Sequence, residues 1–404
     1  MKLLMITGDR ALAQGKKGPF YYTLEEFSKY WERIDVICPK IQNSELKTQN
    51  LFGNVFIHSS SWPLIFQPLF ISKKGAEIFR EQKFDLFTIH SYPPFYNDIG
   101  GLWLYNKLRT SPASSASQTF PTPQTSQTPL TSCTSPTIPY VLEVHHITGC
   151  PRAGDFREKL YSILTRIFIK KFARNATAVR VVNQKQTPEF LIKFGIDKEK
   201  IKYISSAYID LETFKPMSME KKYDIVFAGR LTKNKGIMLL LEAIKKINNQ
   251  KPNIKMIIVG TGPLENKIKK FIKQNQLENN IEFAGWLPGM EDVAKAYNQS
   301  KIFVMPSFNE GGPRVNLEAM ACNVAVITSR VGLMIDIIKD KENGLFVDWD
   351  SKDIADKIML LLEDDDLCKK IAENGYKIVQ QFERKKMIKN YAETYQNLLH
   401  SSGI

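Results

Sequence analysis

Two glutamates stand eight positions apart in the segment Pro306-Ser-Phe-Asn-Glu310-Gly-Gly-Pro-Arg-Val-Asn-Leu-Glu318. The segment follows an apolar run, passes through Gly311 and Gly312, and enters a helical stretch with Pro313 at its start, where proline is tolerated. A helix N-terminus offers unpaired N–H groups to a phosphate or sugar oxygen, and carboxylates on both sides can accept hydrogen bonds from vicinal hydroxyls. The pattern indicates a site for a ribose or hexose, although two glutamates alone favour a routine helix start.

A second group of residues is cationic and lies between another apolar run and another helical stretch. It reads Ala228-Gly229-Arg230-Leu-Thr-Lys-Asn-Lys235-Gly236. Arginine offers a bidentate fork to phosphate and lysine a mobile point charge, and open α/β sheets bind ligands at the carboxyl ends of their strands. Two further glycine turns, at Gly260 and Gly285, also follow apolar runs. We interpret the group as a candidate anion site, while basic residues in such loops are often only solvated.

Short apolar runs alternate with helical stretches in two series, which predicts an α/β fold with two parallel sheets. The expected strands of the first series are Lys2–Thr7, Ile34–Cys38, Asn54–His58, Asp85–His90, Ile138–Val144 and Thr177–Val182. Those of the second are Tyr223–Ala228, Ile254–Val259, Ile281–Ala284, Ile302–Met305, Val324–Thr328 and Gly344–Val347. The chain has 404 residues, which suits two domains because single cores stop growing at about 250–300 residues.

The polar, proline-containing stretch 211–222 is the expected linker. It would separate an N-terminal domain, residues 1–210, from a C-terminal domain, residues 223–380, with a terminal helix at 381–404. Residues 110–137 consist almost entirely of Ser, Thr, Pro, Gln and Ala. We expect them to be a disordered insertion, because this composition buries too little apolar surface to offset its ordering entropy.

The ordered set of these motifs resembles family 4 glycosyltransferases of the GT-B fold. The set runs Gly-Arg-Leu…Lys-Gly, Val-Gly-Thr-Gly-Pro, Phe-Ala-Gly, Pro-Ser…Glu-Gly…Glu-Ala-Met-Ala and Asn343-Gly344-Leu. It spans Gly229 to Leu345, and the whole set is far more specific than any one piece. The resemblance implies two Rossmann-like domains facing across a cleft, with the acceptor bound by the N-terminal domain and the nucleotide sugar by the C-terminal domain.

The resemblance also implies roles for single residues. Arg230 and Lys235 match the pair that holds the donor diphosphate and stabilises its developing charge. Glu310 and Glu318 match the family's Glu-x7-Glu motif, near the donor sugar and on the ribose respectively. The resemblance implies that Asn316 and Leu317 offer backbone N–H groups to the phosphate. The other implied donor-binding positions are Gly229, Gly260, Gly285, Gly311 and Gly312.

In the N-terminal half, the strand that ends in His145 and His146 resembles the family strand with a histidine near the transfer centre. His145 occupies that position and His146 is the near alternative, although a lone histidine is more often structural. His90 ends another expected strand and is a weaker pocket candidate. Gly18 stands where the family often has Gly-Gly, and this departure leaves that loop's contacts with acceptor and diphosphate open.

Family members retain the anomeric configuration, and the departing phosphate oxygen serves as the base. We therefore expect a metal-independent retaining hexosyltransferase that moves a sugar from a nucleoside diphosphate sugar to a glycan or lipid-linked acceptor in polysaccharide or glycoconjugate biosynthesis. We expect no cofactor and no metal, and interpret Asp350 or Ser351 in Asp-Trp-Asp-Ser as a helix cap. The alternatives are a same-fold sugar phosphorylase or synthase, and a non-catalytic nucleotide-sugar-binding scaffold.

The net charge of +14 favours an anionic partner. Seven basic and two acidic residues fall within 152–174, interleaved with apolar ones. Such a helix could lie on an anionic membrane, or its apolar stripe could pack on the sheet and leave the lysines solvated. No nucleic-acid module is recognisable, so nucleic acid is the weaker partner.

The five cysteines are scattered without C-x-x-C spacing, and no apolar run reaches the length of a membrane span. We therefore expect a cytoplasmic protein, with peripheral association at the inner face of the cytoplasmic membrane as a further hypothesis.

Overall fold

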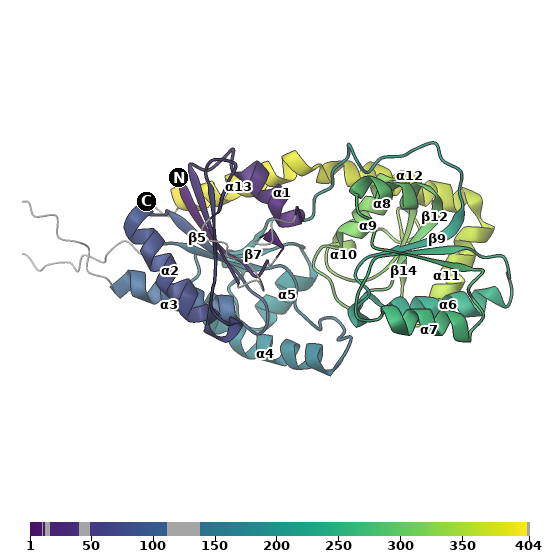
Figure 1. The fold of residues 1–404 in the computed structure, drawn as a ribbon, viewed down its shortest axis with the longest axis horizontal. Coiled ribbons are helices and arrows are strands. Elements are labelled where there is room, and N and C mark those ends of the chain that lie inside the picture. Colours follow the sequence, from purple (N-terminus) through teal and green to yellow (C-terminus); the bar gives the residue numbers. More distant parts are fainter. Residues whose placement is uncertain (10, 13–16, 40–48, 111–137, 402–404) are drawn as a thin grey trace, which may run out of the picture. The chain divides into compact units, whose positions relative to one another are not determined.

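The computed structural model of the chain describes residues 1–9, 11–12, 17–39, 49–110 and 138–401 (Figure 1). The predicted insertion at 110–137 lies outside the described residues except for Thr110, which ends helix α3. The chain divides into two compact units. The first comprises Met1–Glu143, Phe172–Val179 and Tyr395–Ile404, and the second comprises Val144–Lys171 and Arg180–Thr394. These ranges differ from the domains drawn from the sequence, since residues 144–171 and 180–210 belong to the second unit.

The first sheet, as far as the described residues form it, has eight strands in the order β3-β4-β2-β1-β5-β6-β7-β8, and the division between the units falls within it. Strands β1, β2, β4, β5 and β6 pair in parallel, and β3 runs antiparallel to β4. The strands are β1 (Lys2–Ile6), β2 (Arg33–Cys38), β3 (Gln49–Leu51), β4 (Val55–Ser59), β5 (Leu86–His90), β6 (Tyr140–Val144), β7 (Ala178–Val181) and β8 (Ile201–Tyr203).

Five helices and two 3-10 turns accompany the strands of the first sheet among the described residues, and α2 and α3 pack against each other. A 3-10 turn, Leu64–Phe66, leads directly into α2. The helices are α1 (Pro19–Phe27), α2 (Gln67–Gln82), α3 (Tyr96–Thr110), α4 (Phe156–Ala173) and α5 (Gln186–Lys193), with a 3-10 turn at Lys198–Lys200.

The second sheet has six parallel strands in the order β11-β10-β9-β12-β13-β14, with helices on both faces (Figure 1). The strands are β9 (Tyr223–Ala228), β10 (Met256–Val259), β11 (Ile281–Gly285), β12 (Ser300–Met305), β13 (Ala325–Ser329) and β14 (Leu345–Val347). Most positions of β10, β12 and β13 are fully buried, which explains their near-continuous apolar runs.

The helices of the second sheet follow the βα alternation. They are α6 (Ile237–Asn248), α7 (Glu265–Gln274), α8 (Met290–Asn298), α9 (Arg314–Ala321), α10 (Met334–Ile337), α11 (Ser351–Glu363) and α12 (Asp365–Val379), with 3-10 turns at Lys233–Lys235 and Gln380–Phe382. The last helix, α13 (Arg384–Ser401), begins in the second unit, and its residues from Tyr395 belong to the first.

The strand order of the second sheet locates a binding edge. From β9 the chain adds β10 and β11 on one side, then crosses over to place β12, β13 and β14 on the other. Open α/β sheets bind ligands outside the carboxyl ends of the strands where the order reverses. In this unit, the reversal lies between β9 and β12, so the residues that follow these two strands are the first candidates for a binding site.

Candidate active site

Glycines stand at the carboxyl ends of β9, β10 and β11, where the backbones approach one another closely. The N–H of Gly229 donates to the Val259 carbonyl over 3.0 Å, and the N–H of Gly260 donates to the Gly285 carbonyl over 2.6 Å. Gly260 has φ 127°, and a Cβ there would lie 2.0 Å from the Gly229 oxygen. Gly260 is therefore required by the packing of the turns themselves, whatever ligand binds beside them.

Lys235 reaches the binding edge from the turn that follows β9. It ends the 3-10 turn Lys233–Lys235, and Gly236 after it is left-handed with φ 68°. A Cβ on Gly236 would lie 2.0 Å from the Pro306 carbonyl oxygen, so only glycine lets this turn pack against the end of β12. The Nζ of Lys235 donates to Oε1 of Glu310. The two motifs predicted from sequence therefore meet at the reversal point of the sheet.

The Lys235–Glu310 pair is largely shielded from water. The side chain of Lys235 is 11% exposed and that of Glu310 is 15% exposed. Ser307 also donates to Oε1 of Glu310, over 3.2 Å. Charges this poorly solvated interact much more strongly than surface charges. A phosphate or sugar that approaches this pair therefore meets fixed, opposite charges.

The backbone around Gly311 fixes the loop that carries Glu310. The Gly311 carbonyl accepts from the N–H of Leu333 over 2.8 Å and from the side-chain amide of Asn183 over 3.4 Å. A Cβ on Gly311 would lie 1.9 Å from the His145 carbonyl oxygen. The predicted donor-site glycine Gly311 is therefore where the second unit's segment after β6 meets the glutamate loop. Gly312 is less constrained, since its nearest neighbour would be the Ala207 Cβ at 3.3 Å.

The two candidate histidines have different partners. Nε2 of His145 lies 3.4 Å from a guanidinium nitrogen of Arg180, which can only donate a hydrogen bond. His146 instead responds to the charges of Glu310, Lys235 and Arg230. Burial lowers its pKa below 6.5, and the charges of His145, Lys235 and Arg230 lower it further, against the opposing effect of the Glu310 carboxylate. Burial and the two cations thus favour the neutral form of the His146 ring, which lies in the field of the candidate site.

Arg230 is exposed, in contrast to Lys235. Its charge is felt at His146, so it belongs to the same electrostatic neighbourhood. This arrangement suits an anion that enters from solvent. The buried ammonium of Lys235 would bind its inner side, and the exposed guanidinium of Arg230 would bind its solvent-facing side with two hydrogen bonds.

Glu318, the second glutamate, lies on α9 and is half-buried. The Tyr297 hydroxyl donates to its Oε2 over 3.1 Å. Burial raises the pKa of Glu318, while this hydrogen bond and the charge of Arg314 oppose the shift. Tyr297 thus fixes one carboxylate oxygen of Glu318. A carboxylate held in place in this way is preorganised to bind the neighbouring hydroxyls of a sugar.

Asn316 and Leu317 are buried in the first turn of α9. The N–H of Asn316 donates to the Pro313 carbonyl over 3.2 Å. The Asn316 side-chain amide is buried without a hydrogen-bond partner among the residues that the structure describes. The role of the two backbone N–H groups at a phosphate stays a prediction.

Gly18 and His90 belong to the first unit. Gly18 precedes the first turn of α1, where an added Cβ would contact nothing within 4 Å. His90 ends β5, pairs in register with Glu143, and its ring lies 5.6 Å from that of Tyr92. The fold places His90 at a strand end of the first sheet and Gly18 at a helix start, and their assignment to the acceptor stays a prediction.

Sequence reasoning missed Arg180 and Tyr391. Arg180 is 1% exposed, donates to the Tyr391 hydroxyl over 2.6 Å and to the Ile204 carbonyl over 3.0 Å, and lies 3.7 Å above the Tyr391 ring. It therefore links α13 to His145 within the second unit. The signal present in the sequence was an arginine inside the apolar run Ala-Val-Arg-Val-Val, since a buried charge needs partners.

The Asp-Trp-Asp motif behaves as predicted. Asp350 caps α11, and its carboxylate accepts from the Asp353 N–H over 3.4 Å. Between its two aspartates, Trp349 donates from Nε1 to the Ser307 carbonyl over 2.8 Å.

No cluster of three His, Cys, Asp or Glu side chains suited to a metal occurs within the described ranges. Within the same ranges, no helix is both long and apolar enough to span a membrane.

Comparison with known proteins finds similarity to glycosyltransferases. Residues 209–378 match the glycosyl transferases group 1 family. The chain is 27% identical over 356 residues to an uncharacterized glycosyltransferase of Methanocaldococcus jannaschii, covering 87% of each chain. It is 34% identical to the capsular polysaccharide biosynthesis glycosyltransferase CapM of Staphylococcus aureus, over 40% of this chain and 42% of that one. It is 32% identical to an N-acetylgalactosaminyltransferase of Campylobacter jejuni named for an undecaprenol-diphosphate-linked glycan, over 41% and 46%.

Solved structures show the same fold. The Anabaena protein HepE, in complex with UDP and glucose, matches with a TM-score of 0.71 at 18% identity, over 98% of this chain and 99% of that one. Sucrose-phosphate synthase of Thermosynechococcus elongatus matches with a TM-score of 0.78 at 18% identity, over 99% of both. The expected α/β, GT-B fold is thus confirmed, and residues 209–378 are similar to the glycosyl transferases group 1 family.

Proposed function

We propose that this chain is a group 1 glycosyltransferase that moves a sugar from a nucleoside diphosphate sugar to a glycan or lipid-linked acceptor, with retention of configuration and without a metal ion. The observation that carries the proposal is the Lys235–Glu310 pair at the point where the strand order of the second sheet reverses. The named activities of the relatives and the UDP and glucose bound by HepE support the substrate classes.

In this proposal, Lys235 and Arg230 hold the diphosphate. Negative charge grows on the leaving phosphate as the glycosidic bond breaks, and cations already in place stabilise it without reorganisation. Lys235 is fixed by Glu310 and largely shielded from water, so solvent screens its attraction for a bound phosphate only weakly. Arg230, being exposed, closes the outer side.

Glu310 orients the donor sugar. Both of its described hydrogen bonds, from Lys235 and Ser307, end on Oε1. We assign Oε2 to the sugar hydroxyls and Glu318 to the ribose hydroxyls, with Tyr297 holding Glu318 in place. The neutral ring of His146 supplies a further hydrogen bond near the sugar.

Retention follows if the acceptor hydroxyl attacks from the side the diphosphate leaves, and its proton passes to the departing phosphate oxygen. A double displacement would instead require a carboxylate nucleophile, and Glu310 is the candidate for that role. Glu310→Gln distinguishes the two. Our account predicts slow transfer that added azide does not change, whereas formation of a glycosyl azide only in the variant, with the nucleoside diphosphate as leaving group, would assign the nucleophilic role to Glu310.

A panel of UDP-, GDP- and ADP-sugars tests the proposal. A bound donor should raise the melting temperature, since a ligand specific for the folded state adds stability that grows with its concentration. Nucleotide release is then measured with and without glycan or lipid-linked acceptors. Binding without turnover on any acceptor would favour the scaffold, and release of a sugar 1-phosphate in the presence of inorganic phosphate would favour a phosphorylase.

A further inference from the structure

Helix α4, Phe156–Ala173, exposes an apolar stripe that sequence alone could have assigned to the core. The exposed fractions are 80% for Phe156, 43% for Leu160, 44% for Ile163 and 61% for Ile167. Their spacing of four, three and four residues places them on one narrow face of a helix with 3.6 residues per turn. The stripe therefore does not pack on the sheet, which was the alternative left open by the sequence.

The opposite face of α4 is the one that packs. Ser162, Thr165 and Ile169 are buried. Glu158 lies on the same side, and its Oε2 accepts from the Asn309 side chain over 2.9 Å and from the Gly154 N–H over 2.7 Å. One face of the helix is thus fully used by the fold, and the apolar stripe on the other is left to solvent.

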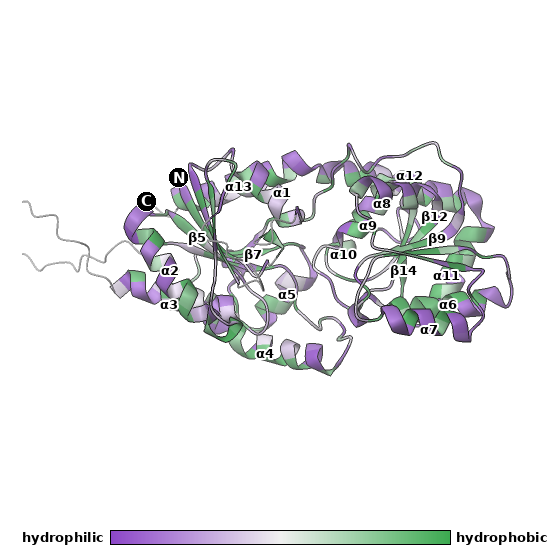
Figure 2. Cartoon of the chain, viewed as in Figure 1, coloured by the Kyte–Doolittle hydropathy of each residue, from purple (hydrophilic) through white to green (hydrophobic). Residues whose placement is uncertain are grey.

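Basic side chains flank the stripe on both sides, and all of them are exposed: Arg157, Lys159, Arg166, Lys170 and Lys171. The two acidic residues of the segment do not lie among them. Glu158 faces the protein, and Asp155, which precedes the helix, lies 3.8 Å from Lys233. The exposed surface is therefore both apolar and positive. The ribbon of α4 alternates between hydrophilic and hydrophobic residues along its length (Figure 2).

We propose that this surface of α4, called the α4 stripe and made of Phe156, Leu160, Ile163 and Ile167 with the five basic residues above, docks on an anionic lipid bilayer. An amphipathic helix with a basic polar face lies in the membrane interface through its apolar side chains. Its lysines and arginines bind anionic headgroups electrostatically. The charge pattern favours lipid over a second copy of the chain, which would bring like charges together.

The same helix is bonded to the candidate site. Residues just before it and in its first turn contact the loop that leads to Glu310. Asn309 donates to the Arg152 carbonyl over 2.9 Å, and the Arg152 guanidinium lies 5.1 Å from the Phe308 ring and 5.3 Å from the Trp349 ring. A bilayer on the α4 stripe would hold the candidate site at a set distance from the membrane, where a lipid-linked acceptor resides. This last step rests on the proposed function; the docking itself does not.

Vesicle co-sedimentation of the full chain tests the docking. Vesicles contain phosphatidylcholine alone or phosphatidylcholine with phosphatidylglycerol, at low and at high salt. We expect binding only to the phosphatidylglycerol vesicles, weakened by salt. The double variant Phe156→Ser/Ile167→Ser should reduce the partition coefficient at least about tenfold, and Lys159→Glu/Lys170→Glu should reduce it about fivefold or more for each residue changed.

Matched controls are available in the same unit. Ile192 is 44% exposed on α5, and Lys245 and Lys246 are exposed on α6. Ile192→Ser and Lys245→Glu/Lys246→Glu should leave vesicle binding unchanged. Wild-type protein that binds neither vesicle type, or α4 variants that bind as the wild type does, would overturn the proposal. So would a change of oligomeric state in Phe156→Ser/Ile167→Ser by light scattering, because the stripe would then be a contact between copies.

The experiment also separates this inference from the proposed function. Vesicle binding is measured without a donor, and melting shifts with UDP-sugars are measured without vesicles. An α4 variant that keeps its donor shift but loses vesicle binding supports the docking alone. A protein that binds vesicles but no donor would leave the docking intact and count against the proposed function.

Discussion

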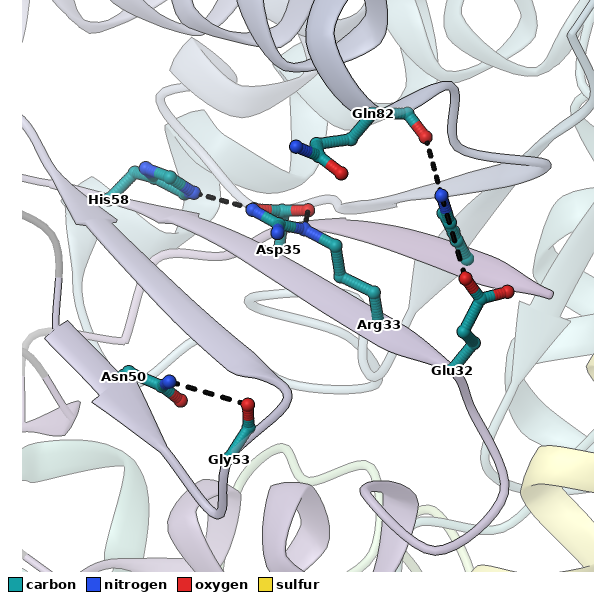
Figure 3. A network of polar contacts seen from close by, with 8 residues as sticks. Glu32, Arg33, Asp35, Asn50, Gly53, His58 and Gln82 are labelled. Carbon is teal, nitrogen blue, oxygen red and sulfur yellow. Dashed lines mark hydrogen bonds and ion pairs between the residues drawn. The ribbon is translucent and has the colours of Figure 1, made fainter.

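Two clusters of buried charge, one in each unit, show how placement in a sheet separates support from chemistry. In the first unit, Asp35 on β2 accepts from Arg33 over 2.8 and 3.1 Å and lies 2.7 Å from Nε2 of His58 on β4 (Figure 3). In the second unit, Lys235 pairs with Glu310. Both clusters combine opposite charges in shielded surroundings, yet they lie at different points along their strands.

Asp35 lies inside its strand, in register with Phe56 of β4, and the Arg33 guanidinium lies 3.8 Å from the Phe56 ring. The side chain of Asp35 is 3% exposed and that of His58 is 6% exposed, so the sheet surrounds both. Lys235 and Glu310 follow the ends of β9 and β12, beside the exposed Arg230. The comparison teaches that buried charge marks a candidate site when it stands at the reversing strand ends, and marks architecture when it stands inside a strand.

The largest effect on stability should come from Asp35→Ala. It leaves Arg33 and His58 without their shared carboxylate, and breaking a buried pair by removing one partner costs about 3–5 kcal/mol. Urea unfolding measures this cost, with the exposed Glu81→Ala in the same unit as the control. Donor binding by the folded variant should be unchanged. A decrease in the free energy of unfolding of less than about 1 kcal/mol, as for exposed ion pairs, would show that Asp35 does not hold the sheet together.

Gly311→Ala tests the other cluster through its backbone. The added methyl would lie 1.9 Å from the His145 carbonyl oxygen, so the glutamate loop has to move. We expect about 2–3 kcal/mol of destabilisation together with loss of transfer, because small misplacements of a positioning loop cost about a hundredfold in rate. Gly312→Ala, with its nearest neighbour at 3.3 Å, is the control and should be much milder. Equal effects in both variants would show that the loop is not held at Gly311.

The histidines offer a sharper comparison within the second unit. His146→Ala should reduce transfer by about 10²-fold, the lower end of what a positioned polar group contributes, because its ring lies in the field of Glu310, Lys235 and Arg230. His145→Ala should reduce it less, because that ring is tied to Arg180. Steady-state rates at saturating donor decide between them. A larger rate loss in His145→Ala than in His146→Ala would instead favour His145 as the histidine near the transfer centre, as the family resemblance implies.

Tyr391→Phe removes the hydroxyl that accepts from Arg180 over 2.6 Å and keeps the ring beneath the guanidinium. Hydrogen bonds to charged groups contribute about 1.5–3 kcal/mol, and the retained ring should keep the loss near the lower limit. Thermal unfolding measures it. Tyr376→Phe on α12 serves as a comparison, and a variant as stable as the wild type would show that Arg180 does not depend on this bond.

The smallest expected effect concerns pH. Burial raises the pKa of Asp35, but hydrogen bonds and charges from His58 and Arg33 outweigh it, so the pKa lies below 3.8 in the folded protein. A lowered pKa contributes stability that is complete above the unfolded value and is lost as pH falls through the folded value. Urea unfolding below pH 4 should show this loss in the wild type and a shallower dependence in Asp35→Asn. Parallel curves would contradict it.

Much of the architecture was predictable because both sheets bury their central strands on both faces. All twelve predicted strands are present, and β9 matches its predicted range residue for residue. Among the described residues, the strands that were missed are β3 and β8, which are three residues long and read Gln-Asn-Leu and Ile-Lys-Tyr. Such short, polar segments have no apolar period, and only their neighbours in the sheet make them strands.

The site was predictable as residue types and strand ends, but its contacts were not. Sequence placed Lys235 and Glu310 after separate strands, and only the strand order brings them together. It offered His145 and His146 without a means to separate their surroundings, which depend on Arg180 from β7. The α4 stripe was equally ambiguous, because apolar residues at helical spacing do not tell whether the fold covers or exposes that face.

The central claim is that a buried lysine at the reversing strand ends binds the donor diphosphate. Calorimetric titration of UDP into the wild type, Lys235→Met and Lys233→Met tests it most directly. Lys233 is two residues away, 61% exposed and 3.8 Å from Asp155, so it is a matched lysine outside the pair. We predict that Lys235→Met weakens binding at least about tenfold, since a charge-assisted hydrogen bond contributes about 1.5–3 kcal/mol, while Lys233→Met binds as the wild type does. Equal affinities of all three proteins for UDP would contradict the account.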